Sequence, residues 1–269
     1  MIKRLELLRL DYLFSVLIPV LLAIYLNNLN PFSHFDIIIG FVFLGITGNV
    51  WNDYYDMKNP KDKITQDRVK GYHPRELFSI GLGSFFLGIT LLIRTCLHNF
   101  INLILLGSIV FLVFIYCFVL KSIPIINNLV LVFSHVILPY LIIKIDAAIF
   151  LFRIDELMML VAFVLFSVTA QFVHEVIDNE ALINRFSLKT CQRIIWIFSI
   201  GTLSSAILGI ILLQDFYLAP ILFMPLGIMF TFRKAKKPTR GVKDVGIILG
   251  NLFLLYFFGL IVLQLNLII

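Results

Sequence analysis

Residues 36–56 of the chain read DIIIGFVFLGITGNVWNDYYD. The first part of this stretch, 36–53, is apolar and long enough to cross most of a bilayer as a helix. Its polar end carries Asp53 and Asp56, which are three residues apart, so on a helix the two carboxylates share one face. Carboxylates within or at the edge of a membrane span are costly to place and are functional by default. The stretch therefore predicts a transmembrane helix whose last turns take part in chemistry.

A second stretch, QFVHEVID at 171–178, repeats this arrangement at the end of another apolar run. Glu175 and Asp178 are again three residues apart and share a helix face. The two clusters end the second and the sixth apolar runs, and because four is an even number, both open on the same side of the membrane. Two such pairs directed at one pocket could hold divalent metal ions, which a protein can use to bind a diphosphate. We therefore expect the two helix ends to face each other across a shared pocket.

The composition predicts an integral membrane protein of the all-α class. The chain of 269 residues is 60% hydrophobic and 14% charged, and its mean hydropathy is +1.00. A soluble domain of this size could not bury so much apolar surface. No low-complexity tail or linker divides the sequence, so we expect one membrane domain over 1–269. Because a span needs about 20 residues, we predict a bundle of nine transmembrane helices, at 11–28, 36–53, 77–96, 99–120, 125–144, 156–174, 191–213, 216–232 and 244–267.

The basic residues predict the orientation of these spans. With the N-terminus in the cytoplasm, 19 of the 22 Lys and Arg residues fall on the cytoplasmic side, as the positive-inside rule requires. Only Arg94, Lys144 and Arg153 fall outside. The net charge of +6 therefore reflects topology and contact with membrane lipid rather than nucleic acid binding. We expect a multi-pass protein of a prokaryotic plasma membrane, with both acidic clusters at the cytoplasmic face.

At this point the sequence resembles the UbiA superfamily of intramembrane prenyltransferases. The stretch 49–56 resembles the Asn-Asp-x-x-Asp element that ends the second helix of that family. Asp62, six residues after Asp56, resembles the third acid of menaquinone-pathway members. Arg68, followed by Gly71 and Pro74, resembles the pattern that comes next.

Two further parts of the chain resemble the same family. Tyr116 and Lys121 resemble the Tyr and Lys that close the fourth helix. The second cluster differs from the common Asp-x-x-x-Asp signature, because Glu175 and Asp178 are three residues apart, but it is similar to the His-Glu-x-x-Asp form of some branches. The resemblance covers nearly the whole chain.

The resemblance implies transfer of an isoprenoid chain from a prenyl diphosphate to an aromatic or other hydrophobic lipid acceptor. It also implies two Mg²⁺ ions, which would neutralise the charge that grows on the leaving diphosphate. The implied metal ligands are Asp53, Asp56, Asp62, Glu175 and Asp178. The residues implied to contact the diphosphate are Asn49, Tyr55, Arg68 and Lys121. The implied catalytic set is Asn49, Asn52, Asp53, Asp56, Arg68, Tyr116, Lys121, Glu175 and Asp178.

Alternative functions remain open at the level of sequence. Some members of the superfamily are terpene cyclases, in which a double bond of the substrate itself attacks the cation. A cation-coupled transporter is a different class, but its ion site usually lies near the midplane on broken helices, whereas both clusters here end spans. The sequence does not fix the acceptor, the length of the prenyl chain or the oligomeric state.

Overall fold

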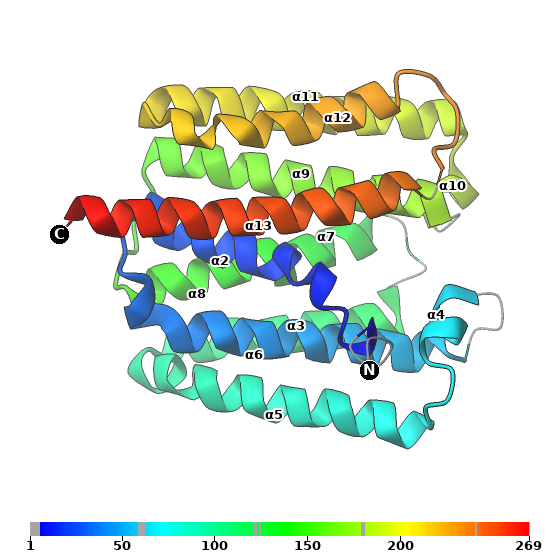
Figure 1. Ribbon diagram of the computed structural model, residues 1–269, viewed down its shortest axis with the longest axis horizontal. Helices are drawn as coiled ribbons and strands as arrows, with labels where there is room; N and C mark the ends of the chain where they lie inside the picture. The colour runs from blue at the N-terminus through cyan, green and yellow to red at the C-terminus, as the bar shows by residue number, and fades with distance from the viewer. Residues whose placement is uncertain are drawn as a thin grey trace.

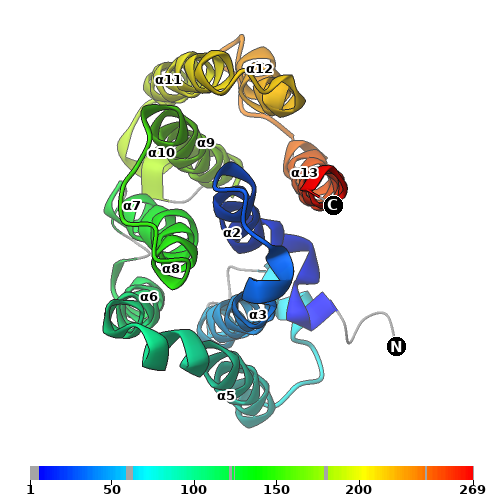
Figure 2. The same cartoon turned by 90° about the vertical axis from the view of Figure 1, so that its left-hand side faces the viewer.

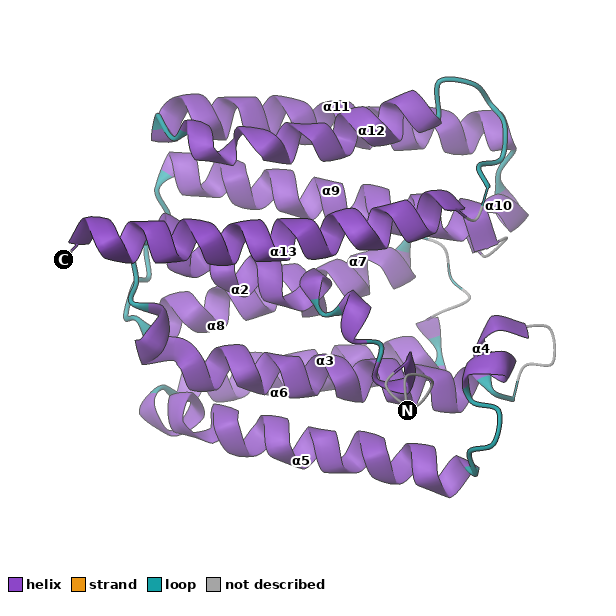
Figure 3. Cartoon of the chain, in the orientation of Figure 1, coloured by secondary structure: helices purple, strands orange, loops and turns teal. Residues whose placement is uncertain are grey.

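The structure is a computed structural model that describes residues 6–58, 63–120, 123, 125–178, 181–239 and 241–268. The described residues form helices and the turns that join them, with no strand among them (Figure 3). The long helices run side by side and build one bundle (Figure 1). This arrangement confirms the predicted all-α class.

Eight helical segments of the described chain are long and apolar enough to cross a membrane. The first joins two short 3₁₀ turns, η1 (Glu6–Leu8) and η2 (Leu10–Tyr12), to α2 (Phe14–Leu26). The fifth joins α7 (Ile126–Val132) to α8 (Leu138–Asp146) through a π-helical turn, η5 (Phe133–Ile137). The other six are α3 (Phe35–Asp56), which follows η3 (Pro31–His34), and α5 (Pro74–His98), α6 (Phe100–Phe118), α9 (Ile154–Asp178), α11 (Leu188–Leu213) and α13 (Gly241–Ile268).

The predicted span at 216–232 is shorter than the other spans in the structure, as its predicted bounds indicate. It consists of a 3₁₀ helix, η6 (Phe216–Leu222), and α12 (Phe223–Thr231), with Pro220 inside η6. A 3₁₀ helix rises about 2.0 Å per residue and an α-helix about 1.5 Å, so the segment still covers about 27 Å. It packs along α11 (Figure 1). The bundle thus contains eight long helices and one shorter apolar helix within the described residues.

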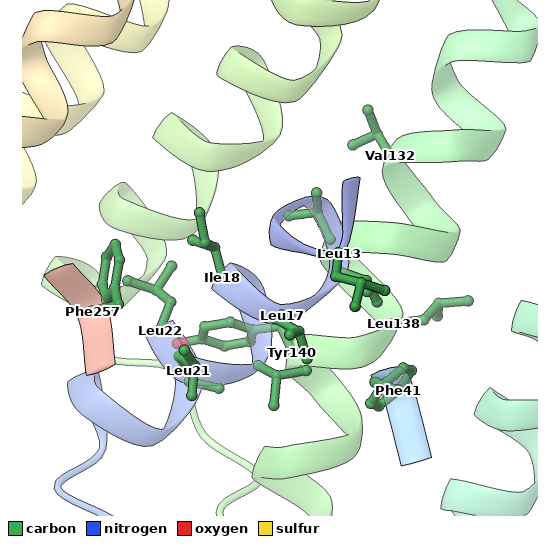
Figure 4. Close-up of a cluster of buried hydrophobic side chains, with 14 of the residues drawn as sticks. Leu13, Leu17, Ile18, Leu21, Leu22, Phe41, Val132, Leu138, Tyr140 and Phe257 are labelled. Carbon is green, nitrogen blue, oxygen red and sulfur yellow. The ribbon is translucent and has the colours of Figure 1, made fainter. Parts of the chain in front are cut away.

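Helix α2 lies in the middle of the bundle (Figure 2). Five consecutive residues, Val20–Ile24, have no exposed surface. A helix that is apolar on all sides is expected to be buried on all sides. Figure 4 shows Leu17, Leu21 and Leu22 of α2 in one cluster with Tyr140 of α8 and Phe257 of α13. This central helix carries the N-terminal turns, and with them Arg9, to one end of the bundle.

Both acidic pairs lie at the same end of the bundle, where α3 and α9 terminate (Figure 1). We call it the acidic end. Two short helices follow there, α4 (Lys63–Arg68) after α3 and α10 (Ala181–Arg185) after α9. The shared location agrees with the even number of spans between the two clusters.

The three basic residues that the orientation rule leaves out are all paired with acids in the structure. Lys144 Nζ lies 2.6 Å from an oxygen of Glu156, and neither side chain is more than 1% exposed. Arg94 Nη2 donates to Asp36 at 2.9 Å. Arg153 Nε donates to Asp155 at 3.2 Å. Because each of these cations is accompanied by an anion, none adds net positive charge to its side of the bundle.

Candidate active site

The first acidic pair ends α3, and its Asp53 is fully buried. Arg68, the last residue of α4, donates from Nη1 to both oxygens of this carboxylate, at 2.7 and 2.8 Å. Arg9 lies farther away, with Nη1 3.6 Å from Oδ1. A buried carboxylate is tolerated only when it is paired and hydrogen-bonded. Two arginines meet that requirement for Asp53.

Arg9 is held in place by its own backbone as well as by its charge. It stands between η1 and η2 in the left-handed region, with φ 47°. The side chain of Asn49 donates to its carbonyl oxygen at 3.2 Å. Its guanidinium lies over the ring of Tyr12, 4.2 Å from the centroid, which is a favourable cation–π distance. The sequence did not predict this contact of Asn49. Its effect is to tie the N-terminal turns to α3.

The remaining predicted residues of α3 lie next to this pair. Asn52 donates to Asp56 at 2.9 Å, because the two residues are neighbours one helical turn apart. Tyr55 packs against Phe118 of α6, with ring centroids 4.4 Å apart. Tyr116 is half-buried in the last turn of α6. An aromatic contact therefore joins the ends of α3 and α6.

The second pair ends α9, and its Glu175 is 2% exposed. One of its oxygens accepts from the side chains of Asn127 and Asn128 of α7, at 2.7 and 2.9 Å. The other accepts from the backbone N–H of Leu182 in α10, at 2.8 Å. An ionised carboxylate can accept about four hydrogen bonds, and Glu175 accepts three of them from these donors. These contacts make Glu175 the residue that fixes α7 and α10 to the end of α9.

Asp178 has different partners, and both are ionisable. Lys243, in the first turn of α13, lies 2.7 Å from Oδ2 through its Nζ atom. His174, one turn earlier on α9, lies 3.2 Å from the same oxygen through Nδ1. The side chains of Lys243 and Asp178 are 21% and 17% exposed. Asp178 is therefore the more accessible acid of the second pair.

Asp62 and Lys121 lie outside the described residues, so the structure gives no account of their predicted roles. Among the described residues, no group of three or more His, Cys, Asp and Glu side chains gathers closely enough to hold a metal on its own. Mg²⁺ does not need such a cage, because it is usually held by one or two carboxylates together with water and substrate phosphates. The oxygen donors of Asp53, Asp56 and Asp178 fit that mode of binding.

Sequence reasoning missed Asn127, Asn128 and Lys243. The two asparagines open an apolar span, and that polar pair was a visible signal. Lys243 had no such signal, because it is 65 residues from Asp178 along the chain.

Two hollows of the described part of the chain border α13, and neither is lined by the predicted acids. A surface groove of about 470 Å³ lies along α13, with Asp11, Asp244 and Asn251 among its lining residues. A small apolar hollow of about 40 Å³ lies between α2, α9, α12 and α13, and Phe14 and Phe163 border it. The expectation that both clusters share one pocket stays a prediction.

The chain was compared with curated proteins, solved structures and models of protein families. No curated protein and no solved structure matches the chain. The sequence model of the UbiA prenyltransferase family matches residues 16–257, a range that begins within α2, ends within α13 and includes both acidic pairs. The chain belongs to the UbiA prenyltransferase family.

Proposed function

We propose that this protein transfers an isoprenoid chain from a prenyl diphosphate to an aromatic or lipid acceptor within the membrane. Its family supports membrane prenyl transfer in general. The observation that carries the proposal is the pairing of acids with cations at one end of the bundle. Asp53 is paired with Arg68, and Asp178 with Lys243. A site that binds a metal diphosphate needs both kinds of side chain, acids for the metal and bases for the phosphate oxygens.

The acids would hold the metal. Mg²⁺ bound at this end would neutralise the negative charge that develops as the C–O bond of the donor breaks. Asp53, Asp56 and Asp178 are the proposed ligands among residues with described contacts, and Asp62 joins them from the sequence. Glu175 is proposed to act at the same end, with at most one oxygen position left for a metal.

The basic and polar side chains would bind the diphosphate. Arg68 presents a planar fork that suits phosphate oxygens, and Lys121 would add a point charge. Asn49 holds Arg9 beside Asp53, so its proposed contribution is to keep a second guanidinium at the site. Tyr55 is proposed to contact the diphosphate from the adjoining turn of α3.

The surroundings of the acidic end suit a hydrocarbon chain. Tyr54, Tyr55 and Phe118 form a chain of ring contacts there, with centroids 5.2 and 4.4 Å apart. A ring face stabilises a nearby cation by about 0.5–2 kcal/mol, and departure of the diphosphate leaves an allylic cation. The tail itself would lie among apolar helices. We further propose that the acidic end faces the cytoplasm of a prokaryotic cell, as the basic residues predict.

The test is turnover by the purified full-length protein with Mg²⁺ and a panel of prenyl diphosphates, each with and without aromatic and lipid acceptors. The expected result is a prenylated acceptor with at least one donor, lost on chelation. Asp53→Asn combined with Asp56→Asn should abolish it. Asp155→Asn, a matched change at the opposite end of the bundle, should leave it intact. Full activity in EDTA would reject the metal assignment, and a cyclic hydrocarbon formed without acceptor would make the protein a cyclase instead.

A further inference from the structure

In each of the two acidic pairs, a basic side chain from another helix contacts a carboxylate. Arg68 lies on Asp53 and Lys243 lies on Asp178, with closest distances of 2.7 Å in both cases. Arg68 and Lys243 are also similarly accessible, with side chains 18% and 21% exposed. The basic atoms therefore stand where a divalent cation would have to approach these oxygens.

Lys243 is one of several residues that hold α13 in place. Farther along α13, the side chain of Asn251 donates to the carbonyl oxygen of Asp11 at 2.8 Å. Gly250 lies so close to the ring of Phe14 that an added Cβ would be 2.6 Å from it. These contacts fix α13 against α2 and η2 independently of its first turn. The Lys243–Asp178 pair is therefore not the only contact that positions α13 among the described residues.

We propose that Lys243 is a diphosphate-binding residue, which Asp178 holds as a counter-ion until substrate arrives. The inference rests on the proposed function and adds a residue to it. When a divalent cation takes the oxygen of Asp178, Lys243 is released and turns to the phosphate oxygens of the same metal diphosphate. Every charged group keeps an oppositely charged partner in this exchange. The carboxylate binds the metal in place of the ammonium, and the ammonium binds phosphate in place of the carboxylate.

The exchange makes binding of the metal and of the diphosphate cooperative. Without diphosphate, a metal at Asp178 must displace Lys243 and leave its positive charge nearby, so it binds weakly. With diphosphate present, the released ammonium gains charge-assisted hydrogen bonds. Removing Lys243 should therefore change the two affinities in opposite directions, which loosening of α13 could not do.

The experiment uses the full-length protein in detergent, with Mn²⁺ and inorganic pyrophosphate as probes and calorimetry as the readout. In Lys243→Met, Mn²⁺ alone should bind about three-fold more tightly, because a partly exposed competing ion pair is gone. Pyrophosphate, titrated in saturating Mn²⁺, should bind about ten-fold more weakly, because a hydrogen bond between charged groups is lost. Lys243→Arg should restore both affinities towards those of the wild type.

Lys234→Met serves as the matched control, because Lys234 is exposed in the turn before α13 and its loss should change neither affinity. Two outcomes overturn the inference: Lys243→Met weakens both ligands, or it leaves both unchanged, while the wild type still binds Mn²⁺ and transfers prenyl groups. A wild-type protein that binds no Mn²⁺, with or without pyrophosphate, rejects the metal-dependent function and this inference with it. The two failures are therefore distinguishable.

Discussion

Replacing Arg68 by Ala should destabilise the protein. The loss should be larger than for the same replacement at any other exposed or partly exposed arginine of the acidic end. The substitution removes two hydrogen bonds, at 2.7 and 2.8 Å, from a carboxylate with no exposed surface. Leaving one member of a buried ion pair alone costs about 3–5 kcal/mol. Arg9 remains 3.6 Å from Asp53 and offsets part of this cost. We therefore expect a loss of about 2–3 kcal/mol in the free energy of unfolding.

The assay is thermal unfolding in detergent, in which this loss corresponds to a Tm lowered by about 5–10 °C. Lys70→Ala is the matched control, because Lys70 is exposed two residues away. Asp53→Asn combined with Arg68→Ala should recover part of the loss, since no charge is then left unpaired, and the double-mutant cycle isolates the pairwise energy. Mg²⁺ should raise the Tm of Arg68→Ala more than that of the wild type. Equal Tm values for Arg68→Ala and Lys70→Ala would refute the assigned pairing.

Three further changes test other contacts. Glu156→Gln should lower the free energy of unfolding by about 3–5 kcal/mol, because it leaves Lys144 buried without its anion. Adding Lys144→Met should reverse much of this loss. Equal Tm values for Glu156→Gln and for the double variant would contradict this reasoning. Gly81→Ala places a Cβ 2.3 Å from Trp51 Nε1, so it should cost about 1–3 kcal/mol and shift the tryptophan emission, whereas an unchanged spectrum would dismiss the contact. Asn128→Ala should reduce prenyl transfer and lower the Tm by about 2–6 °C, and wild-type values would show that it does not position the second acidic pair.

The span positions could be predicted because they depend on local composition. A run of about 20 apolar residues has few alternatives in a membrane, and the run at 36–53 became the body of α3. The segment at 216–232 was also predicted, and its bounds agree with the observed Phe216–Thr231. What the sequence did not predict is the 3₁₀ geometry of Phe216–Leu222, because a count of apolar residues carries no information about it.

The common end of the two acidic pairs was also predictable, because an even number of spans returns the chain to the same side. What parity cannot supply is the partner of each acid. Glu175 and Asp178 look equivalent in sequence, three residues apart and on one face, yet the structure separates their roles. Among the described residues, the donors to Glu175 are neutral and come from α7 and α10, whereas Asp178 faces a lysine of α13.

This difference follows from where each side chain points as α9 ends. Successive helix positions are rotated by about 100°, so Glu175 and Asp178 point in directions that differ by about 60° around the axis. This difference lets Glu175 meet buried asparagines and Asp178 meet a partly exposed lysine. A carboxylate that accepts neutral hydrogen bonds can stay buried through the reaction, since no charge has to leave. A carboxylate paired with a partly exposed ammonium can exchange it for a metal. The pairing, more than the spacing of the acids, is therefore our reason to propose that Asp178 is the member of the second pair that changes partners in the proposed reaction.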